Sequence, residues 1–150
     1  AIELTNRSEQ IAPDYYATYK IRMASYRAQG ETHKAIDDAI RFFELNGFSG
    51  IPDLDPIVLC DVPYAHNVVK QKINMSNNKE EWEIFDVMIN VLNADYDRAL
   101  KQLSVLEKEY GLTLAIVITR AECYSRMGDT EKEQAELAKA FEDYPLDSVE

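Results

Sequence analysis

Residues 114–145 read LAIVITRAECYSRMGDTEKEQAELAKAFEDYP and carry the clearest helical pattern of the chain. Apolar residues recur at helical spacing up to Gly128, and a second periodic segment then runs to Pro145. Glycine favours the left-handed backbone that ends a helix, and proline cannot continue one. Thr130 followed three residues later by Glu133 is typical of a helix start. The stretch therefore predicts two helices joined by a tight turn.

Shifting the sequence by 34 residues brings a similar pattern onto residues 80–113. The overlay contains five identities where composition alone gives roughly two. The identical pairs are Ile84 and Ile118, Asp95 and Asp129, Leu103 and Leu137, Tyr110 and Tyr144, and Leu112 and Leu146. Asn78 with Glu81 predicts the helix start of this window, and Gly111 predicts its end. The two windows indicate two consecutive helical hairpins.

The N-terminal third shows the same arrangement. A helix is predicted from Pro13 to Gln29, ended by Gly30, and a second over residues 32–45, ended by Asn46 and Gly47. Residues 1–12 have weak periodicity and are interpreted as a frayed tail or the last turn of a preceding repeat.

The intervening segment, residues 48–79, contains Pro52, Pro56 and Pro63, which exclude one long helix. We expect a short helix over residues 55–60 and another opened by Pro63, together a degenerate hairpin. The prediction is a single all-α domain, residues 1–150, of three to four hairpins. Their bounds are 16–47, 48–79 (degenerate), 80–113 and 114–147.

With these residues the chain resembles the tetratricopeptide repeat family, whose 34-residue unit is a helix, a tight turn and a second helix. A unit that starts at Leu114 matches the family pattern at Ala121, Tyr124, Gly128, Asp129, Ala140 and Pro145. A unit starting at Glu80 matches at Ala94, Asp95 and Ala99, and one starting at Tyr16 matches at Tyr26, Gly30 and Ala35. The resemblance implies a right-handed superhelical stack whose concave face binds a peptide or helix of a partner protein.

The resemblance also implies which positions line that face. They are Lys20, Ala24 and Arg27 in the first unit, Ile84, Met88 and Val91 in the next, and Ile118, Glu122 and Ser125 in the last. This surface is basic at one end and apolar in the middle. Its basic end is compatible with an acidic peptide.

Charge and hydropathy exclude other partners. The chain carries 27 Asp and Glu against 16 Lys and Arg, a net charge of −11, which repels a phosphate backbone. We therefore expect no direct nucleic-acid ligand. No apolar run reaches the 18 or so residues of a membrane-spanning helix, so the chain is predicted to be soluble and without a membrane span.

No catalytic motif, cofactor site or metal-ligand spacing is present in the sequence, and we predict a non-enzyme. Cys60 and Cys123 are interpreted as two buried thiols, with a disulfide between them as the alternative. A nucleophile at Cys60, with Asp61 and His66 nearby in sequence, is the less favoured interpretation of Cys60. His33 is assigned to a surface turn. Trp82 is expected to be half-buried, and the tyrosines are assigned to packing between hairpins; these are Tyr15, Tyr16, Tyr19 and Tyr26.

Two alternatives stay open. The chain could be a regulatory, sensory or oligomerisation domain of a larger protein, such as a bacterial transcription regulator. Leu137 and Phe141 on the final helix lack a predicted cover, which favours a homodimer through the uncapped C-terminal hairpin or a truncated chain. The cytoplasm is the expected compartment, with the bacterial periplasm or export as the alternative because Ala1 is not preceded by Met.

Overall fold

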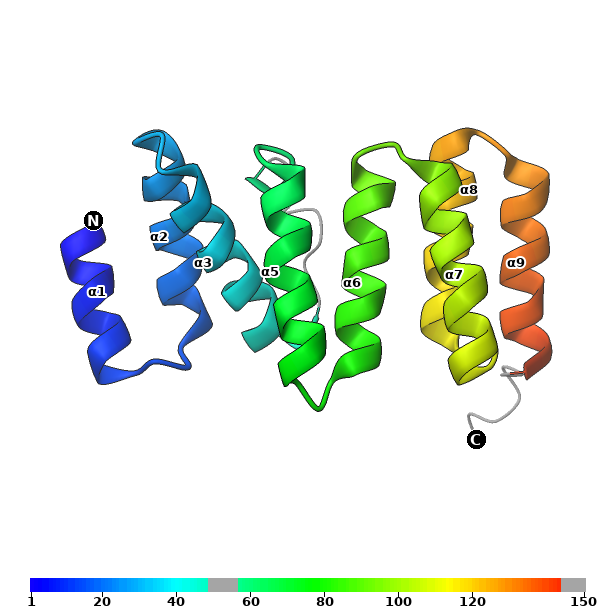
Figure 1. Cartoon of the computed structure of the whole chain (residues 1–150), viewed down its shortest axis with the longest axis horizontal. Helices are drawn as coiled ribbons and strands as arrows, with labels where there is room; N and C mark the ends of the chain where they lie inside the picture. Colours follow the sequence, from blue (N-terminus) through cyan, green and yellow to red (C-terminus); the bar gives the residue numbers. More distant parts are fainter. Residues whose placement is uncertain (49–56, 144–150) are drawn as a thin grey trace. The chain divides into compact units, whose positions relative to one another are not determined.

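A computed structural model of the chain describes residues 1–48 and 57–143. These residues contain eight α-helices and no strand, which confirms the predicted all-α class (Figure 1). The helices group into two compact units, unit 1 (Ala1–Asn77) and unit 2 (Asn78–Glu150). The predicted helix stop at Pro145 lies outside the described residues.

Unit 1 contains α1 (Ile2–Ile11), α2 (Tyr16–Ala28), α3 (Thr32–Leu45) and α5 (Val62–Met75). Helices α2 and α3 form a hairpin, α1 packs against α2, and α5 packs against α3. The bounds of α3 are those predicted from the sequence. Two predictions are corrected. Helix α2 begins at Tyr16 because Pro13 and Asp14 form a turn, and α1 is a full helix rather than a frayed tail or a last turn.

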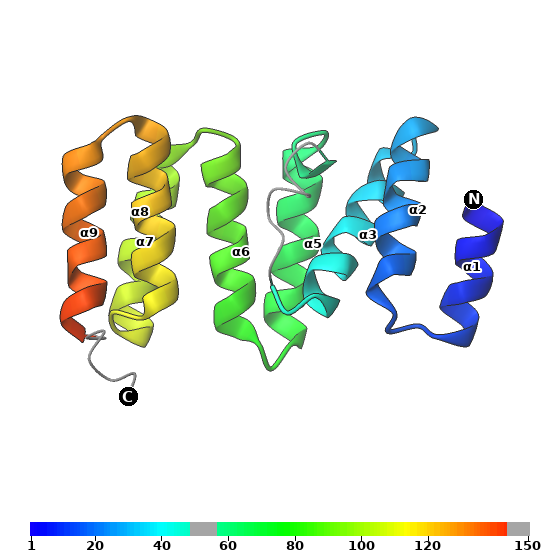
Figure 2. The same ribbon diagram turned by 180° about the vertical axis from the view of Figure 1, so that it is seen from behind.

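Unit 2 contains α6 (Lys79–Leu92), α7 (Tyr96–Tyr110), α8 (Leu114–Met127) and α9 (Thr130–Asp143). Helices α6 and α7 form one hairpin and α8 and α9 form a second, as the sequence predicts (Figure 2). Helix α8 also packs against α7, which joins the two hairpins of this unit.

Three hairpins turn through the same backbone geometry. The residue at the bend has a positive φ in each case: Gly30 at 75°, Ala94 at 60° and Gly128 at 78°. The next residue donates its N–H five positions back, over 2.9 Å from Glu31 to Tyr26, 2.8 Å from Asp95 to Asn90 and 2.9 Å from Asp129 to Tyr124. This pairing satisfies carbonyls that the helix end leaves open, so the bends follow from helix termination.

The predicted capping boxes are only partly right. Asn78 does precede α6, but its side chain makes no cap hydrogen bond. At α9 the side chain that accepts from the first turn belongs to Asp129, whose Oδ1 receives the N–H of Lys132 at 3.2 Å, and not to Thr130. A carboxylate at this place also favours the positive end of the helix dipole.

The helix predicted to start at Pro63 is α5. Pro63 lies in its first turn, and Asp61 caps it by accepting the N–H of Tyr64 at 3.0 Å. Of the short helix predicted over residues 55–60, residues 57 and 58 are helical, whereas residues 59 and 60 form a turn instead. Residues 55 and 56 lie outside the described residues.

Burial corrects three side-chain predictions. Trp82 is completely buried rather than half-buried, and Cys60 is exposed whereas Cys123 is buried as expected. Of the tyrosines assigned to packing, Tyr19 is buried, but Tyr15 and Tyr16 are 56% and 46% exposed. The two exposed rings are therefore available to a ligand.

Candidate functional site

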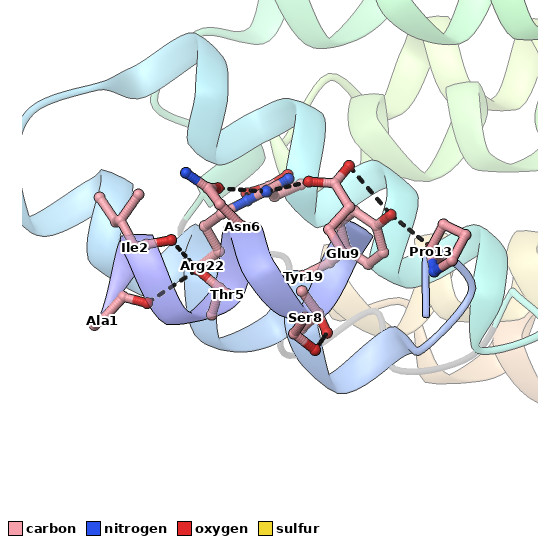
Figure 3. A network of polar contacts seen from close by, with 11 residues as sticks. Ala1, Ile2, Thr5, Asn6, Ser8, Glu9, Pro13, Tyr19 and Arg22 are labelled. Carbon is pink, nitrogen blue, oxygen red and sulfur yellow. Dashed lines mark hydrogen bonds and ion pairs between the residues drawn. The ribbon is translucent and has the colours of Figure 1, made fainter. Parts of the chain in front are cut away.

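Arg22 on α2 is buried, and its guanidinium lies beside Asn6 and Glu9 of α1 (Figure 3). Its Nε and Nη2 donate to the two carboxylate oxygens of Asp38 on α3, each at 2.8 Å. Its Nη1 donates to Glu9 and, at 2.8 Å, to Asn6 Oδ1, both on α1. The fork geometry of a guanidinium suits such a paired contact. We call this set of contacts the Arg22 clamp, because it joins three consecutive helices.

Arg120 forms an equivalent clamp in unit 2. Its Nη2 donates to Glu107 on α7 at 2.6 Å, and its Nη1 donates to Glu136 on α9 at 3.3 Å. Both arginines contact an acid 13 residues before and an acid 16 residues after themselves. In the middle hairpin the corresponding residues are Asp86 and Gln102, whose Nε2 donates to Asp86 Oδ2 at 2.9 Å.

Charge and burial compete in both clamps. The hydrogen bond with Asp38 is the largest influence on the pKa of Arg22 and raises it, whereas burial lowers it. Burial is the largest influence on Asp38 and raises the pKa of that carboxyl, although Arg22 acts in the opposite direction. For Arg120, burial works against the charge, but the hydrogen bond to Glu107 and the charge of Glu136 raise its pKa overall. Both guanidiniums therefore remain charged.

In α2 and α8 the buried clamp arginine marks the side of the helix that faces the core. At about 100° per residue, positions two before, two after and five after the clamp residue lie roughly 140–160° around the helix from it. The nine residues predicted to line a partner site occupy these three positions relative to Arg22, Asp86 and Arg120. They are Lys20, Ala24, Arg27, Ile84, Met88, Val91, Ile118, Glu122 and Ser125.

The structure exposes this stripe on α2 and α8 but not on α6. Lys20, Ala24 and Arg27 are exposed, as are Ile118 and Ser125, while Ile84 and Glu122 are half-buried. Met88 and Val91, in contrast, are 6% and 0% exposed.

A sequence signal accounts for the burial of Met88 and Val91. Residues 85–92, FDVMINVL, are apolar around most of the helix, and such a helix is buried on all sides. In this structure these two side chains are not available to a partner.

Aromatic rings extend the stripe on α2. The ring of Tyr16 lies one turn before Lys20 and 5.9 Å from that of Phe42 on α3, and the Tyr15 ring lies 5.8 Å from that of Tyr16. Lys20 Nζ is 5.6 Å from the Phe42 ring centroid, a cation–π contact. We define the α2 face as Tyr16, Lys20, Ala24 and Arg27. Tyr16 was not among the predicted site residues, although its spacing of four from Lys20 is a signal for it.

Chemically, the α2 face combines two flexible cations with an exposed ring. Lysine and arginine bind carboxylates, and tyrosine supplies apolar contact area with a polar end. This combination suits an acidic segment that also carries apolar side chains.

A polar cluster between α3 and α5 has structural contacts. The His33 ring stacks on Tyr64 at 3.8 Å, His33 Nε2 lies 2.9 Å from Asp61 Oδ2, and the Tyr64 hydroxyl donates to Asp37 at 2.8 Å. The hydrogen bond with His33 lowers the pKa of Asp61, helped by the Tyr64 N–H. Burial, followed by Asp37, raises the pKa of Tyr64 to about 12. The histidine that contacts Asp61 is His33, which lies in the first turn of α3 rather than in the expected surface turn.

Among the described residues, no group of three or more His, Cys, Asp and Glu side chains could hold a metal ion. The helices of residues 1–48 and 57–143 also include none with the length and hydropathy needed to cross a membrane. Comparisons with protein-family models, curated proteins and solved structures found no significant match. Function is therefore inferred from the residues of this chain.

Proposed function

We propose that this protein is a protein-binding module, built of tetratricopeptide-like hairpins, whose α2 face binds an acidic peptide segment of a partner. The observation that carries the proposal is the exposed stripe of the α2 face on the side of the helix opposite the buried Arg22. Because the Arg22 clamp fixes α2 between α1 and α3, the stripe is presented by a rigid helix, which lowers the entropy lost on binding.

The charge distribution supports an acidic ligand at this place. Unit 1 has ten acidic and eight basic residues, whereas unit 2 has seventeen and eight. Unit 1 is thus nearly neutral within an acidic chain. An approaching acidic peptide meets Lys20 and Arg27 there, and complementary charge favours its association rate and orientation.

The proposal extends to the arrangement of the hairpins. Three hairpins share a bend with positive φ and a polar pair at the same positions, which is the regularity expected of repeats. In the proposed right-handed superhelical stack, the α8 residues at the equivalent positions would belong to the binding surface. Of these, Ile118 and Ser125 are exposed and Glu122 is half-buried.

The test measures binding of a labelled synthetic peptide rich in Asp and Leu by fluorescence anisotropy. The double variant Lys20→Glu/Arg27→Glu should weaken binding about tenfold, which corresponds to about 1.4 kcal/mol. Arg7→Glu/Lys70→Glu is the matched control, because it changes two exposed cations of unit 1 outside the α2 face. Equal affinity of the two double variants would exclude the α2 face.

A second candidate function is an oligomerisation or regulatory domain of a larger protein. The exposure of Leu137 and Phe141, 37% and 58%, favours it. Sedimentation at micromolar concentration distinguishes the two functions. A wild-type dimer together with a monomeric Leu137→Gln/Phe141→Gln variant would favour self-association. A strictly monomeric wild type would exclude self-association at that concentration.

A further inference from the structure

Helix α9 carries two large apolar side chains on a side that the described residues leave open. Leu137 is 37% exposed and Phe141 is 58% exposed. They are one helical turn apart and lie on the same side of the helix. We call these two residues the α9 face.

The same positions are buried in the other second helices. Leu103 of α7, which precedes Leu137 by one repeat, is 0% exposed. In α3, Ala39 and Phe43 follow Gly30 at the distances at which Leu137 and Phe141 follow Gly128, and they are 0% and 2% exposed.

Each of these helices is followed by another that packs against it. Helix α8 packs against α7, where Arg120 contacts Glu107, and α5 packs against α3, where Tyr64 contacts Asp37 and stacks on His33. Leu137 and Phe141 follow Leu103 and Glu107 of α7 by 34 residues, and Glu107 contacts Arg120 of α8. The α9 face is therefore equivalent in position to a surface of α7 that receives a helix. Within the described part of the chain, no helix follows α9.

The charge around the α9 face decides what kind of helix fits. Unit 2 has a formal net charge of −9 out of the chain's −11. On α9, Lys132 pairs with Asp129 at 3.6 Å and Lys139 pairs with Glu136 at 2.8 Å.

The remaining acids of α9 add to this field. Glu131, Glu133 and Glu142 form no ion pair with the residues that the structure describes, and Glu131 and Glu142 are exposed. Glu133 lies one turn before Leu137 on the same side of the helix, so an acidic side chain borders the two apolar ones.

We infer that the α9 face binds a basic amphipathic helix of a partner protein, with an apolar stripe on Leu137 and Phe141 and lysine or arginine side chains toward the acids of α9. A second copy of this chain fits less well, because two like faces would bring together two units of net charge −9, and like charges across an interface oppose association. The inference goes beyond the proposed function, since it concerns another unit and a partner of opposite charge.

The probe is a synthetic peptide of about 15 residues, long enough to form a helix on binding, with Leu at i, i+3, i+4 and i+7 and Lys elsewhere. Its counterpart has Glu in place of Lys. Calorimetric titration of the full chain should show binding of the Lys peptide, weakened by salt, and no measurable binding of the Glu peptide.

Matched variants separate the α9 face from general charge attraction. Leu137→Gln/Phe141→Gln should weaken binding of the Lys peptide by about tenfold or more, because it removes the apolar centre of the interface. Val105→Gln/Met127→Gln changes two other exposed apolar residues of unit 2, 61% and 43% exposed, and should leave the affinity unchanged. Circular dichroism checks that all variants stay helical.

Three results would overturn the inference. Equal weakening by both pairs of variants, or none by either, would show that the peptide binds elsewhere. A full-length dimer that is lost in Leu137→Gln/Phe141→Gln would assign the face to a second copy. If the full chain does not bind the Lys peptide but a chain without residues 144–150 does, the α9 face would be assigned to the chain's own C-terminal segment. Loss of acidic-peptide binding at the α2 face would leave this inference untouched.

Discussion

Arg22 of α2 and Arg120 of α8 occupy the same position in two groups of three helices. Each contacts the preceding helix through an acid 13 residues earlier and the following helix through an acid 16 residues later. A second pair of contacts agrees: Lys34 lies over the Tyr26 ring at 5.6 Å, and Lys132 lies over the Tyr124 ring at 5.7 Å. By these contacts, the packing of α1 against α2 corresponds to the packing of α7 against α8.

Replacing Arg22 alone should destabilise unit 1 more than replacing both Arg22 and its partner Asp38. Arg22→Met leaves the Asp38 carboxylate buried without its partner, and breaking a buried pair in this way costs about 3 kcal/mol. Urea unfolding followed by circular dichroism measures the loss.

The control replaces both partners by apolar side chains. Arg22→Met/Asp38→Leu should recover at least half of the lost free energy of unfolding, because no uncompensated charge remains. A double variant that costs the sum of the two single variants would contradict a coupled pair.

Exchanging glycine and alanine should have opposite effects on stability at two of the bends, Gly128 and Ala94. Gly128→Ala should lower the free energy of unfolding by about 1 kcal/mol, because φ is 78° there, and Ala94→Gly should raise it by a similar amount, because φ is 60°. No side chain or backbone atom lies within 4 Å of a Cβ added at Gly128, so the effect is conformational. Destabilisation by Ala94→Gly would contradict the left-handed bend.

Asp61 should make stability depend on pH. Its hydrogen bonds with His33 and Tyr64 hold the pKa of the folded state below that of the unfolded state. The stabilising effect of the carboxylate is therefore present above the unfolded pKa of about 3.9 and is lost as the pH falls through the folded pKa. Asp61→Asn keeps a capping oxygen but loses the charge, so wild type should be the more stable near pH 6, with the difference vanishing at low pH. A difference that does not change with pH would contradict this prediction.

The two cysteines should react at different rates. Cys60 is exposed, whereas Cys123 is buried and its thiol has a pKa raised by burial and by Asp97. A thiol reagent added to the native protein should modify Cys60 first, and Cys123 only on unfolding. Cys60→Ser should abolish the fast phase of the reaction, which is the modification of Cys60 in the native protein. A fast phase that survives in this variant would show that Cys123 is accessible.

Helix ends and bends were predictable because they depend on local chemistry. Gly30, Gly128 and Asn46 mark helix ends in the sequence, and the bounds of α3 followed from Gly30 and Asn46. Ala94 shows the limit, since an alanine with positive φ carries no glycine signal and only the repeat spacing pointed to a bend.

Features that depend on tertiary contacts were not predictable from periodicity. Helix α1 has a weak apolar pattern, and its packing includes polar contacts of Asn6 and Glu9 with Arg22. The clamp itself was missed, because the sequence around an isolated arginine does not indicate which acidic residues it contacts in the fold. The burial of Met88 and Val91 did have a signal, the apolar run of residues 85–92, which the family resemblance outweighed.

Chemical-shift mapping on isotope-labelled protein, titrated with the acidic Asp- and Leu-rich peptide, locates the binding surface residue by residue. If the α2 face is the binding surface, backbone amides of Tyr16, Lys20, Ala24 and Arg27 should shift most, and their shifts should saturate together. Shifts centred on α9 or spread evenly over both units, or no shifts at millimolar peptide, would contradict it.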